Sequence, residues 1–384
     1  MIIKGKLNVG VLDGQWGSSG KGKFNAYLAD KYKIDFAISQ NSVNASHIVV
    51  WDDGTSYKFN HLPTSVINHH VRVIMGAGAS IDLQQLLKEI EDWKLTPERL
   101  FIHPNAVVIT EDDIAYEKGV LQRIASTMTG NGAAMGRKVM RHPNVRTADS
   151  YPQLRQFIAD TSSCIAHWLK NGDTGIIETA QGFDLSMDHG MLFYDENNGI
   201  HKAYPYTTSR NVDPLTFAGL SGVPSRMLGN VLLNLRTYPI KVGDGSNTEF
   251  DGLSGVDMRG SNSGPCWPDQ HELDWERDLG LKPEITSLTK RKRRVFSFSE
   301  MQLKHITKIV QPTHIFLNFV NYLDPTIAGK SGQMSMDTLR NQHYEVWNMV
   351  QLINTEQYWV NTEYAGKVVL LGTGAKHSEV IEIV

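Results

Sequence analysis

The segment that most constrains the fold is a glycine-rich stretch between a short apolar run and a helical pattern. Residues 7–12 (Leu-Asn-Val-Gly-Val-Leu) are typical of a strand buried in a parallel sheet. Residues 14–23 (Gly-Gln-Trp-Gly-Ser-Ser-Gly-Lys-Gly-Lys) follow, and a helical pattern then continues to Tyr32. A strand, a glycine loop and a helix form the βα unit whose backbone N–H groups bind anions. The sequence therefore predicts an α/β protein with a P-loop-like phosphate-binding loop after its first strand.

Further short apolar runs predict a mainly parallel central sheet with helices on both faces. These runs lie at residues 36–38, 71–75, 175–178, 314–319 and 368–371. Residues 82–93 carry leucines and an isoleucine at helical spacing behind Asp82, which predicts a capped helix. Asp53-Gly54, between two strand-like runs, predicts a hairpin turn.

The chain shows no internal repeat and no Pro/Ser-rich linker, so we expect residues 1–384 to form one elaborated domain. Residues 243–264 are rich in Gly, Ser and Asp and predict long loops. Long loops in α/β enzymes usually border the active site.

The composition excludes several classes of protein. A formal charge of -3 gives no global field that attracts nucleic acid or anionic lipid, so we expect neither as a partner. The two cysteines, Cys164 and Cys266, suit a reducing compartment. No apolar run approaches the about 18 residues that cross a bilayer, and residues 7–12 are too short for a signal peptide. We therefore expect a soluble cytoplasmic protein.

The glycine loop departs from the strict P-loop pattern. Five residues separate Gly14 from Gly20 where that pattern has four, and Gly22 stands where the magnesium-holding hydroxyl would be. For the loop taken alone, a plain glycine turn between strand and helix stays an alternative.

The sequence of residues 15–23, Gln-Trp-Gly-x-x-Gly-Lys-Gly-Lys, resembles the opening signature of the adenylosuccinate synthetase family. These ligases join aspartate to C6 of a purine monophosphate. Counterparts of the family's other motifs follow in the same order, from about Leu7 to Gly374: residues 44–48 (Asn-Ala-Ser-His-Ile), 57–63 (Tyr-Lys-Phe-Asn-His-Leu-Pro), 127–132 (Thr-Met-Thr-Gly-Asn-Gly), 138–141 (Lys-Val-Met-Arg), 179–182 (Thr-Ala-Gln-Gly), 188–190 (Asp-His-Gly), 204–209 (Tyr-Pro-Tyr-Thr-Thr-Ser) and 289–294 (Thr-Lys-Arg-Lys-Arg-Arg).

Two departures from the family pattern point to one branch of it. Ser18 and Ser19 replace the family's Asp and Glu, and residues 318–321 (Asn-Phe-Val-Asn) replace the Thr-Lys-x-Asp that reads guanine in the GTP donor. This double departure resembles a bacteriophage branch that converts dGMP and aspartate to the 2-amino-2'-deoxyadenylosuccinate nucleotide. The resemblance implies an enzyme, located in the host cytoplasm if it is phage-encoded.

The resemblance also implies the reaction order: γ-phosphoryl transfer to O6 of the purine, then attack by the aspartate amine. The implied catalytic residues are Ser18, Lys21, His47 and Gln181. The implied donor-binding residues are Gly17, Ser18, Ser19, Gly20, Lys21, Gly22, Lys23, Ser46, His47, Ile48, Arg293, Phe319, Asn321, Gly372, Thr373 and Gly374. Two of these assignments stay open, because Lys23 also fits a solvated helix position and residues 372–374 also fit a plain loop.

The remaining implied sites concern the acceptor, aspartate and magnesium. The residues matched to dGMP are Ser18, Asn44, Ala45, Thr129, Gly130, Arg141, Gln181 and Thr208. Those matched to aspartate are Thr289, Arg291 and Arg293, although residues 290–294 alone would also fit a solvated charged loop or a nucleic-acid patch. Mg²⁺ is the implied cofactor, and Ser18 and Ser46 are the implied metal-binding residues. Arg141 resembles an arginine that a partner subunit supplies, which implies a homodimer.

The altered donor segment predicts an adenine nucleotide, ATP or dATP, as donor. An Asn321 amide has one donor and one acceptor end and suits the N1 and N6 edge of adenine, and Phe319 offers an apolar face to a base. Three alternatives stay open: an ordinary adenylosuccinate synthetase acting on IMP, a different P-loop-like kinase or NTPase, and an inactive nucleotide-binding protein.

Overall fold

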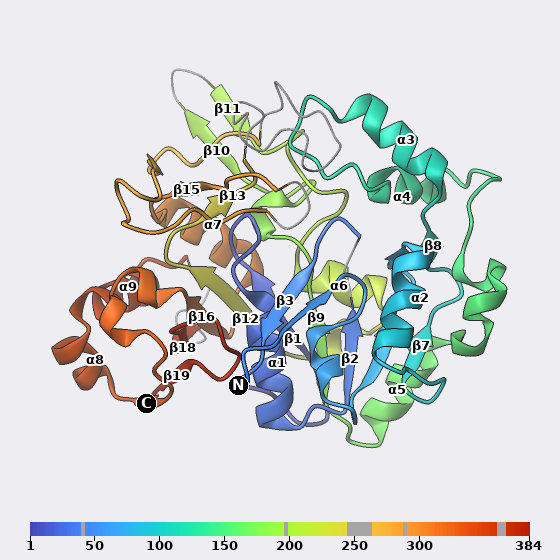
Figure 1. The fold of residues 1–384 in the computed structure, drawn as a ribbon, viewed down its shortest axis with the longest axis horizontal. Helices are drawn as coiled ribbons and strands as arrows, with labels where there is room; N and C mark the ends of the chain where they lie inside the picture. Colours follow the sequence, from blue (N-terminus) through green and yellow to red (C-terminus); the bar gives the residue numbers. More distant parts are fainter. Residues whose placement is uncertain (40–42, 196–198, 244–262, 287–289, 359–365) are drawn as a thin grey trace.

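The computed structural model describes residues 1–39, 43–195, 199–243, 263–286, 290–358 and 366–384. In this part of the chain ten strands form one central sheet, in the order β17-β19-β18-β16-β12-β1-β9-β2-β5-β7 (Figure 1). Neighbouring strands are parallel except for β18 and β19. The strands are β1 (Leu7–Asp13), β2 (Phe36–Ser39), β5 (Arg72–Met75), β7 (Leu100–Ile102), β9 (Gly175–Glu178), β12 (Leu228–Arg236), β16 (His314–Asn318), β17 (Gly332–Met334), β18 (Lys367–Gly372) and β19 (Val380–Ile383).

Helices cover both faces of this sheet. Consecutive residues of a strand point to opposite faces, and here both faces carry apolar side chains that must be buried. Leu233 and Ile177 pack in one apolar cluster with residues of α5, α6, α7 and α9, whereas Leu232 and Ile176 pack against α1 on the other face. The helices are α1 (Lys21–Tyr32), α2 (Leu83–Asp92), α3 (Glu111–Val120), α4 (Asn131–Val139), α5 (Thr161–Lys170), α6 (Pro214–Leu220), α7 (Glu300–Val310), α8 (Met336–Gln342) and α9 (Tyr344–Thr355). The predicted fold class is confirmed.

Short strands make smaller sheets around the central one (Figure 1). They are β3 (His47–Val50) with β4 (Ser56–Phe59), β6 (Ser80–Ile81) with β8 (Val107–Val108), β10 (Leu192–Asp195) with β11 (Gly199–Lys202), and β15 (Arg294–Phe296) between β13 (Ile240–Lys241) and β14 (Glu272–Leu273). The hairpin predicted around Asp53-Gly54 is the β3–β4 pair, and Asp82 caps α2 through Gln85 N. Most of the loop predicted at residues 243–264 lies outside the described residues.

The strand β12 is absent from the sequence prediction although it lies at the centre of the sheet, between β1 and β16. Gly229, Asn230 and Asn234 interrupt its apolar pattern, and Gly and Asn are depleted in strands. Asn234 is tolerated because its amide Nδ2 donates to the backbone oxygen of Ser19, 2.9 Å away, in the adjoining glycine loop.

The carboxyl ends of the central strands bring polar residues to one edge of the sheet. Asp13 ends β1, Glu178 ends β9, Arg236 ends β12 and Asn318 ends β16. Ligands of parallel α/β sheets bind beyond this edge. In the described residues, no helix is long and apolar enough to span a membrane.

Candidate active site

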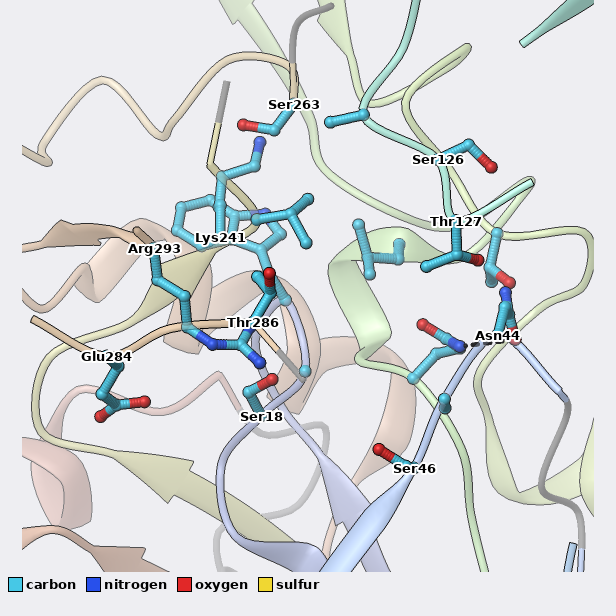
Figure 2. A pocket seen from close by; sticks show the side chains of 18 of the residues that line it. Ser18, Asn44, Ser46, Ser126, Thr127, Lys241, Ser263, Glu284, Thr286 and Arg293 are labelled. Atoms are coloured by element: carbon cyan, nitrogen blue, oxygen red, sulfur yellow. Dashed lines mark hydrogen bonds between the residues drawn. The ribbon is translucent and has the colours of Figure 1, made fainter. Parts of the chain in front are cut away.

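A cavity of about 500 Å³ lies beside the glycine loop. Figure 2 shows its two sides, with Ser18 and Arg293 pointing toward one another on one side and Asn44 and Thr127 on the other. The predicted site residues that line it are Gly17, Ser18, Gly20, Lys21, Gly22, Asn44, Ala45, Ser46, His47, Ile48, Gln181, Thr208, Arg293 and Phe319.

The glycine loop has a left-handed backbone at several positions. The φ angle is 94° at Gly17, 56° at Ser18 and 85° at Gly20. A Cβ atom at Gly20 would meet Asn318 Nδ2 at 2.1 Å, so only glycine fits there. The loop then enters α1 at Lys21, where the N–H groups of the first helical turn have no intrahelical partner.

The two serines that replace the family's acids face different surroundings. Ser18 is exposed to the cavity, whereas Ser19 is completely buried. The Ser19 hydroxyl donates to Asp13 and accepts from Asn234 Nδ2 at 2.9 Å. Of these two serines, Ser18 is therefore the one whose side chain substrates can reach, and the predicted donor role of Ser19 stays a prediction.

Lys21 lies between the loop and the opposite wall of the cavity. Its Nζ donates to Asp13 Oδ2 at 3.2 Å and to the backbone oxygen of Gln181 at 2.8 Å. Gln181 has a φ angle of 69°, and its Nε2 donates to Asn44 Oδ1 at 3.0 Å. These contacts connect three of the sequence motifs through side chains that line one cavity.

His47 is held from behind by a buried carboxylate. Its Nδ1 hydrogen-bonds to Glu178 Oε1, and Glu178 Oε2 accepts from Thr64 N at 2.6 Å and Thr64 Oγ1 at 2.9 Å. Glu178 is fully buried, while His47 lines the cavity. A partner on one ring nitrogen orients the imidazole and leaves the other nitrogen, Nε2, for a ligand.

Arg236 connects the glycine loop with the arginine-rich segment and the donor segment. Its Nη1 donates to Ser18 O at 3.0 Å, and its Nη2 donates to Glu284 Oε1 at 2.6 Å. Its guanidinium also lies over the Phe319 ring, 4.2 Å from the ring centroid. Burial opposes ionisation of Glu284, but the charge and hydrogen bonds of Arg236, the charge of Arg293 and a hydrogen bond from Tyr322 hold the pKa of this carboxyl below its ordinary value.

Of the two arginines assigned to aspartate, only Arg293 lines the cavity. Burial lowers the pKa of Arg293 to about 10, an effect that Glu284 opposes and Arg236 reinforces. Arg291 is buried, and its backbone N–H donates to Thr286 Oγ1 at 2.8 Å. Thr289, the third residue assigned to aspartate, lies outside the described residues.

The contacts of Lys23 bear on the two roles that the sequence left open for it. Lys23 is buried, and its Nζ donates to the backbone oxygens of Gly374 at 2.7 Å and Glu379 at 2.8 Å. Burial lowers the pKa of its ammonium to about 7, which the charge of Glu379 partly opposes. Lys23 is thus not a solvated side chain, and its contacts join α1 to the C-terminal segment; its role as a phosphate ligand stays a prediction.

Other predicted donor residues lie outside the cavity lining. Asn321 is half-buried within a single 3₁₀ turn, residues 320–322; this turn follows Phe319, which does line the cavity and has a φ angle of 62°. Thr373 is buried with its Oγ1 bonded to Lys330 O, and neither it nor Gly372 and Gly374 line the cavity. Contact of these residues with a donor stays a prediction.

The predicted acceptor-phosphate residues divide into two groups. Thr208 lines the cavity, whereas Thr129 and Gly130 lie at the start of α4 and do not. Glu117 accepts the Gly130 N–H at 2.8 Å, so the structure does not offer that amide to a phosphate. Arg141 lies exposed just beyond α4 and does not line the cavity of its own chain.

Comparisons with known proteins assign the family. The adenylosuccinate synthetase family model matches residues 10–152 and 145–328. The chain belongs to the adenylosuccinate synthetase family. Within it, the chain is 36% identical over 327 residues to the N6-succino-2-amino-2'-deoxyadenylate synthase of Vibrio phage phiVC8, covering 82% of this chain and 86% of that protein. It is 29% identical over 326 residues to the adenylosuccinate synthetase of Methanococcus aeolicus, covering 83% and 86%.

A solved structure resembles the whole chain. The succinoaminodeoxyadenylate synthetase of cyanophage S-2L, bound to dGMP and to dATP as an energy donor, superposes with a TM-score of 0.77 at 26% identity. The match covers 98% of this chain and 95% of that one. The family predicted from the motifs is confirmed.

Sequence reasoning missed four residues of this site: Asp13, Glu178, Arg236 and Glu284. Asp13, Glu178 and Arg236 are charged residues that each end a strand, which is the signal that could have identified them; Glu284 lies in a segment without helix or strand, shortly before residues 289–294. Glu284 carries the one carboxylate among the described residues that line the cavity. In the described part of the chain, no group of three or more His, Cys, Asp and Glu side chains could hold a metal ion.

Proposed function

We propose that the protein joins L-aspartate to C6 of dGMP, driven by an adenine nucleoside triphosphate, with dATP or ATP as donor. The product is the 2-amino-2'-deoxy-N6-succinyl-adenylate nucleotide. The observation that carries this proposal is Ser18, a small neutral side chain exposed in the cavity where the family has a carboxylate. Two phage relatives, 36% and 32% identical to this chain, carry the corresponding name, and the cyanophage structure contains dGMP and dATP.

The first step transfers the γ-phosphoryl group to O6 of dGMP. The O6–P bond forms, the bond between the γ-phosphorus and the nucleoside diphosphate breaks, and the N1 proton of guanine passes to water. Such a transfer is governed by positioning and charge neutralisation. Lys21 and the start of α1 would hold the donor phosphates, and His47 Nε2 would donate to the bridging oxygen or γ-phosphate.

In the second step the aspartate amine attacks C6, and phosphate leaves with O6. The Arg293 guanidinium, which lines the cavity, would hold a carboxylate of aspartate through paired N–H donors. Gln181 would contact the purine. It lines the cavity, where its side-chain Nε2 donates to Asn44 and its backbone oxygen accepts from Lys21. Thr208 and Asn44, which also line the cavity, would position the acceptor phosphate.

Magnesium fits this cavity as an ion carried by the nucleotide. The lining offers the hydroxyls of Ser18 and Ser46, and its described carboxylate, Glu284, is paired with Arg236. Mg²⁺ commonly binds through few protein groups, with phosphates and waters completing its coordination. When bound, it would neutralise phosphate charge.

A homodimer with Arg141 acting in trans is part of the proposal. Arg141 is exposed and outside its own cavity, and the adjacent Val139 and Met140 are 77% and 70% exposed. Adjacent exposed apolar side chains are frequent at protein interfaces. A second subunit covering this end of α4 would bury them and carry its arginine toward the acceptor phosphate.

The test is a substrate-omission assay with purified protein, dGMP, L-aspartate, dATP and Mg²⁺. We expect phosphate release only when all are present, and mass spectrometry should identify the succinylated nucleotide. Phosphate release without aspartate would indicate an NTPase instead, and formation of nucleoside diphosphate without phosphate release would indicate a kinase. Absence of turnover with every purine monophosphate would indicate an inactive nucleotide-binding protein.

The donor is tested by replacing dATP with GTP. We expect GTP to be at least about tenfold poorer, equivalent to about 1.4 kcal/mol. Asn321→Asp should improve GTP relative to dATP, because an aspartate accepts both N–H groups of the guanine edge. Asn171→Asp, the same charge change at an exposed position at the end of α5, is the matched control and should leave the ratio unchanged.

A further inference from the structure

The carboxylate of Asp13 organises the glycine loop from inside. Oδ1 accepts the backbone N–H groups of Gln15 at 2.9 Å and Gly17 at 3.2 Å. Oδ2 accepts the backbone N–H of Ser19 at 3.2 Å, the Ser19 hydroxyl and Lys21 Nζ. Asp13 has no exposed surface. The N–H groups of the loop thus surround the Asp13 carboxylate, an anion of the chain itself and not of a ligand.

Because of these contacts, some N–H groups of the loop bind Asp13, and only the others remain for a phosphate. Successive N–H groups that converge on one point form an anion site. In this loop the amides of Gln15, Gly17 and Ser19 converge on Asp13, so they are already satisfied before a nucleotide binds. We therefore expect donor phosphates to be bound by the remaining groups at the start of α1 and by Lys21 rather than by the Gly17 backbone N–H.

Asp13 also fixes where the charge of Lys21 lies. Lys21 is 5% exposed, and its ammonium has two described partners, Asp13 Oδ2 on the loop and the Gln181 carbonyl on the opposite wall. A flexible lysine is therefore held at the boundary between the donor loop and the side chain next to the purine. That boundary is where the transferred phosphoryl group must pass.

We propose that Asp13 is a positioning residue for phosphoryl transfer: its buried carboxylate holds the Lys21 ammonium against Gln181, so that one cation contacts the γ-phosphoryl group as it moves to O6. This inference rests on the proposed function. Asp13 itself has no exposed surface and acts through Lys21.

The experiment compares Asp13→Asn with Asp35→Asn in the full-length enzyme. Asn keeps the size of the side chain but removes the charge and turns an N–H₂ end toward donors. Asp35 is a matched control because its Oδ2 also accepts a backbone N–H, that of Thr174 at 2.8 Å, next to the amino end of β2 and away from the cavity. Circular dichroism and thermal unfolding establish that both variants fold.

We expect Asp13→Asn to lower kcat by about 100-fold, the scale expected when a catalytic group is misplaced by about 1 Å. KM for L-aspartate should stay within about threefold of the parent value, because Arg293 is not displaced. Asp35→Asn should keep the parent kcat. If Asp13→Asn fails to fold, Asp13→Glu takes its place: it keeps the charge, moves it by one methylene, and should lower kcat at least about tenfold.

A double-mutant cycle separates positioning from loop stability. If Asp13 acts through Lys21, the double variant Asp13→Asn, Lys21→Gln should have the same kcat as Lys21→Gln, within about threefold. Multiplied losses would overturn the proposal, as would a folded Asp13→Asn or Asp13→Glu variant with parent kcat. A parent enzyme that does not turn over dGMP with aspartate would instead contradict the proposed function.

Discussion

Glu178 and His47 form a buried carboxylate–imidazole pair in which the carboxylate contacts Nδ1 and leaves Nε2 to the cavity. The two residues come from different parts of the chain: Glu178 ends β9 in the central sheet, and His47 begins β3 in the small hairpin. The same carboxylate also accepts two hydrogen bonds from Thr64. The sheet edge therefore orients a side chain that belongs to a separate hairpin.

We predict that Glu178→Gln lowers kcat by about 100-fold, within the range that a positioned proton donor or acceptor contributes. An amide fixes the imidazole less firmly than a carboxylate and does not favour the same ring tautomer. Thr64→Val is the control, because it removes a hydroxyl partner of Glu178 and keeps the contact with His47. Steady-state kinetics of both variants check this, and a Thr64→Val loss as large as that of Glu178→Gln would contradict it.

Arg141 is predicted to act on the site of the partner subunit. Arg141→Leu and Lys21→Gln should each be nearly inactive, but mixing them should restore activity, because a hybrid dimer contains one intact site. Mixing Lys21→Gln with His47→Asn is the control and should restore nothing, since both groups serve the cavity of their own chain. Subunit exchange without recovered activity would rule out the shared site.

The buried Lys23 ammonium predicts a pH dependence of stability. The pKa of Lys23 is about 7 in the folded chain, below its ordinary value of 10.5, so between these pH values the unfolded chain binds the extra proton. The contribution of Lys23 to the unfolding free energy therefore rises with pH across this window, by up to about 1.4 kcal/mol per pH unit.

Urea unfolding of the parent and Lys23→Met between pH 6.5 and 10 measures this contribution. The difference in unfolding free energy, parent minus variant, should increase with pH above about 7. Lys118→Met, at an exposed position on α3, should give a difference that does not change with pH. A flat difference for Lys23→Met would show that its ammonium is not buried as described.

Ser18 is predicted to select the acceptor. The 2-amino group of guanine adjoins N1, and a serine leaves room for it and accepts one hydrogen bond, whereas a carboxylate would crowd it. Ser18→Asp should therefore lower activity on dGMP and shift the dGMP-to-IMP ratio toward IMP. Aspartate tolerates the positive φ of 56° at this position, so the variant should fold. An unchanged ratio would make Ser18 a tolerated loop residue.

The sequence predicted the fold class and most strands because buried parallel strands are short apolar runs. It did not predict β12, whose glycine and asparagines serve neighbouring segments: Asn234 bonds the glycine loop, and this long-range contact has no local pattern. Phe319 was placed at the end of a strand, but β16 ends at Asn318 and Phe319 turns left-handed.

For the site, motif order predicted which residues meet, and the cavity brings together the residues of the glycine loop, residues 44–48, Gln181 and Arg293. The motifs do not show which of their side chains are buried inside the folded chain. Ser19 and Lys23 carry motif positions, yet both are enclosed by contacts inside the chain. Asp13 and Arg236 organise the loop from strand ends, where a single charged residue looks like any other until the tertiary structure pairs it.

The most direct test of the account is the ratio of kcat/KM for dGMP to kcat/KM for IMP, measured with dATP, L-aspartate and Mg²⁺. A site built to hydrogen-bond one substrate group rejects an analogue that lacks it by up to about 10⁴-fold or more. We predict a ratio above about 100 in favour of dGMP. A ratio of one or below would contradict the assignment and indicate an ordinary adenylosuccinate synthetase.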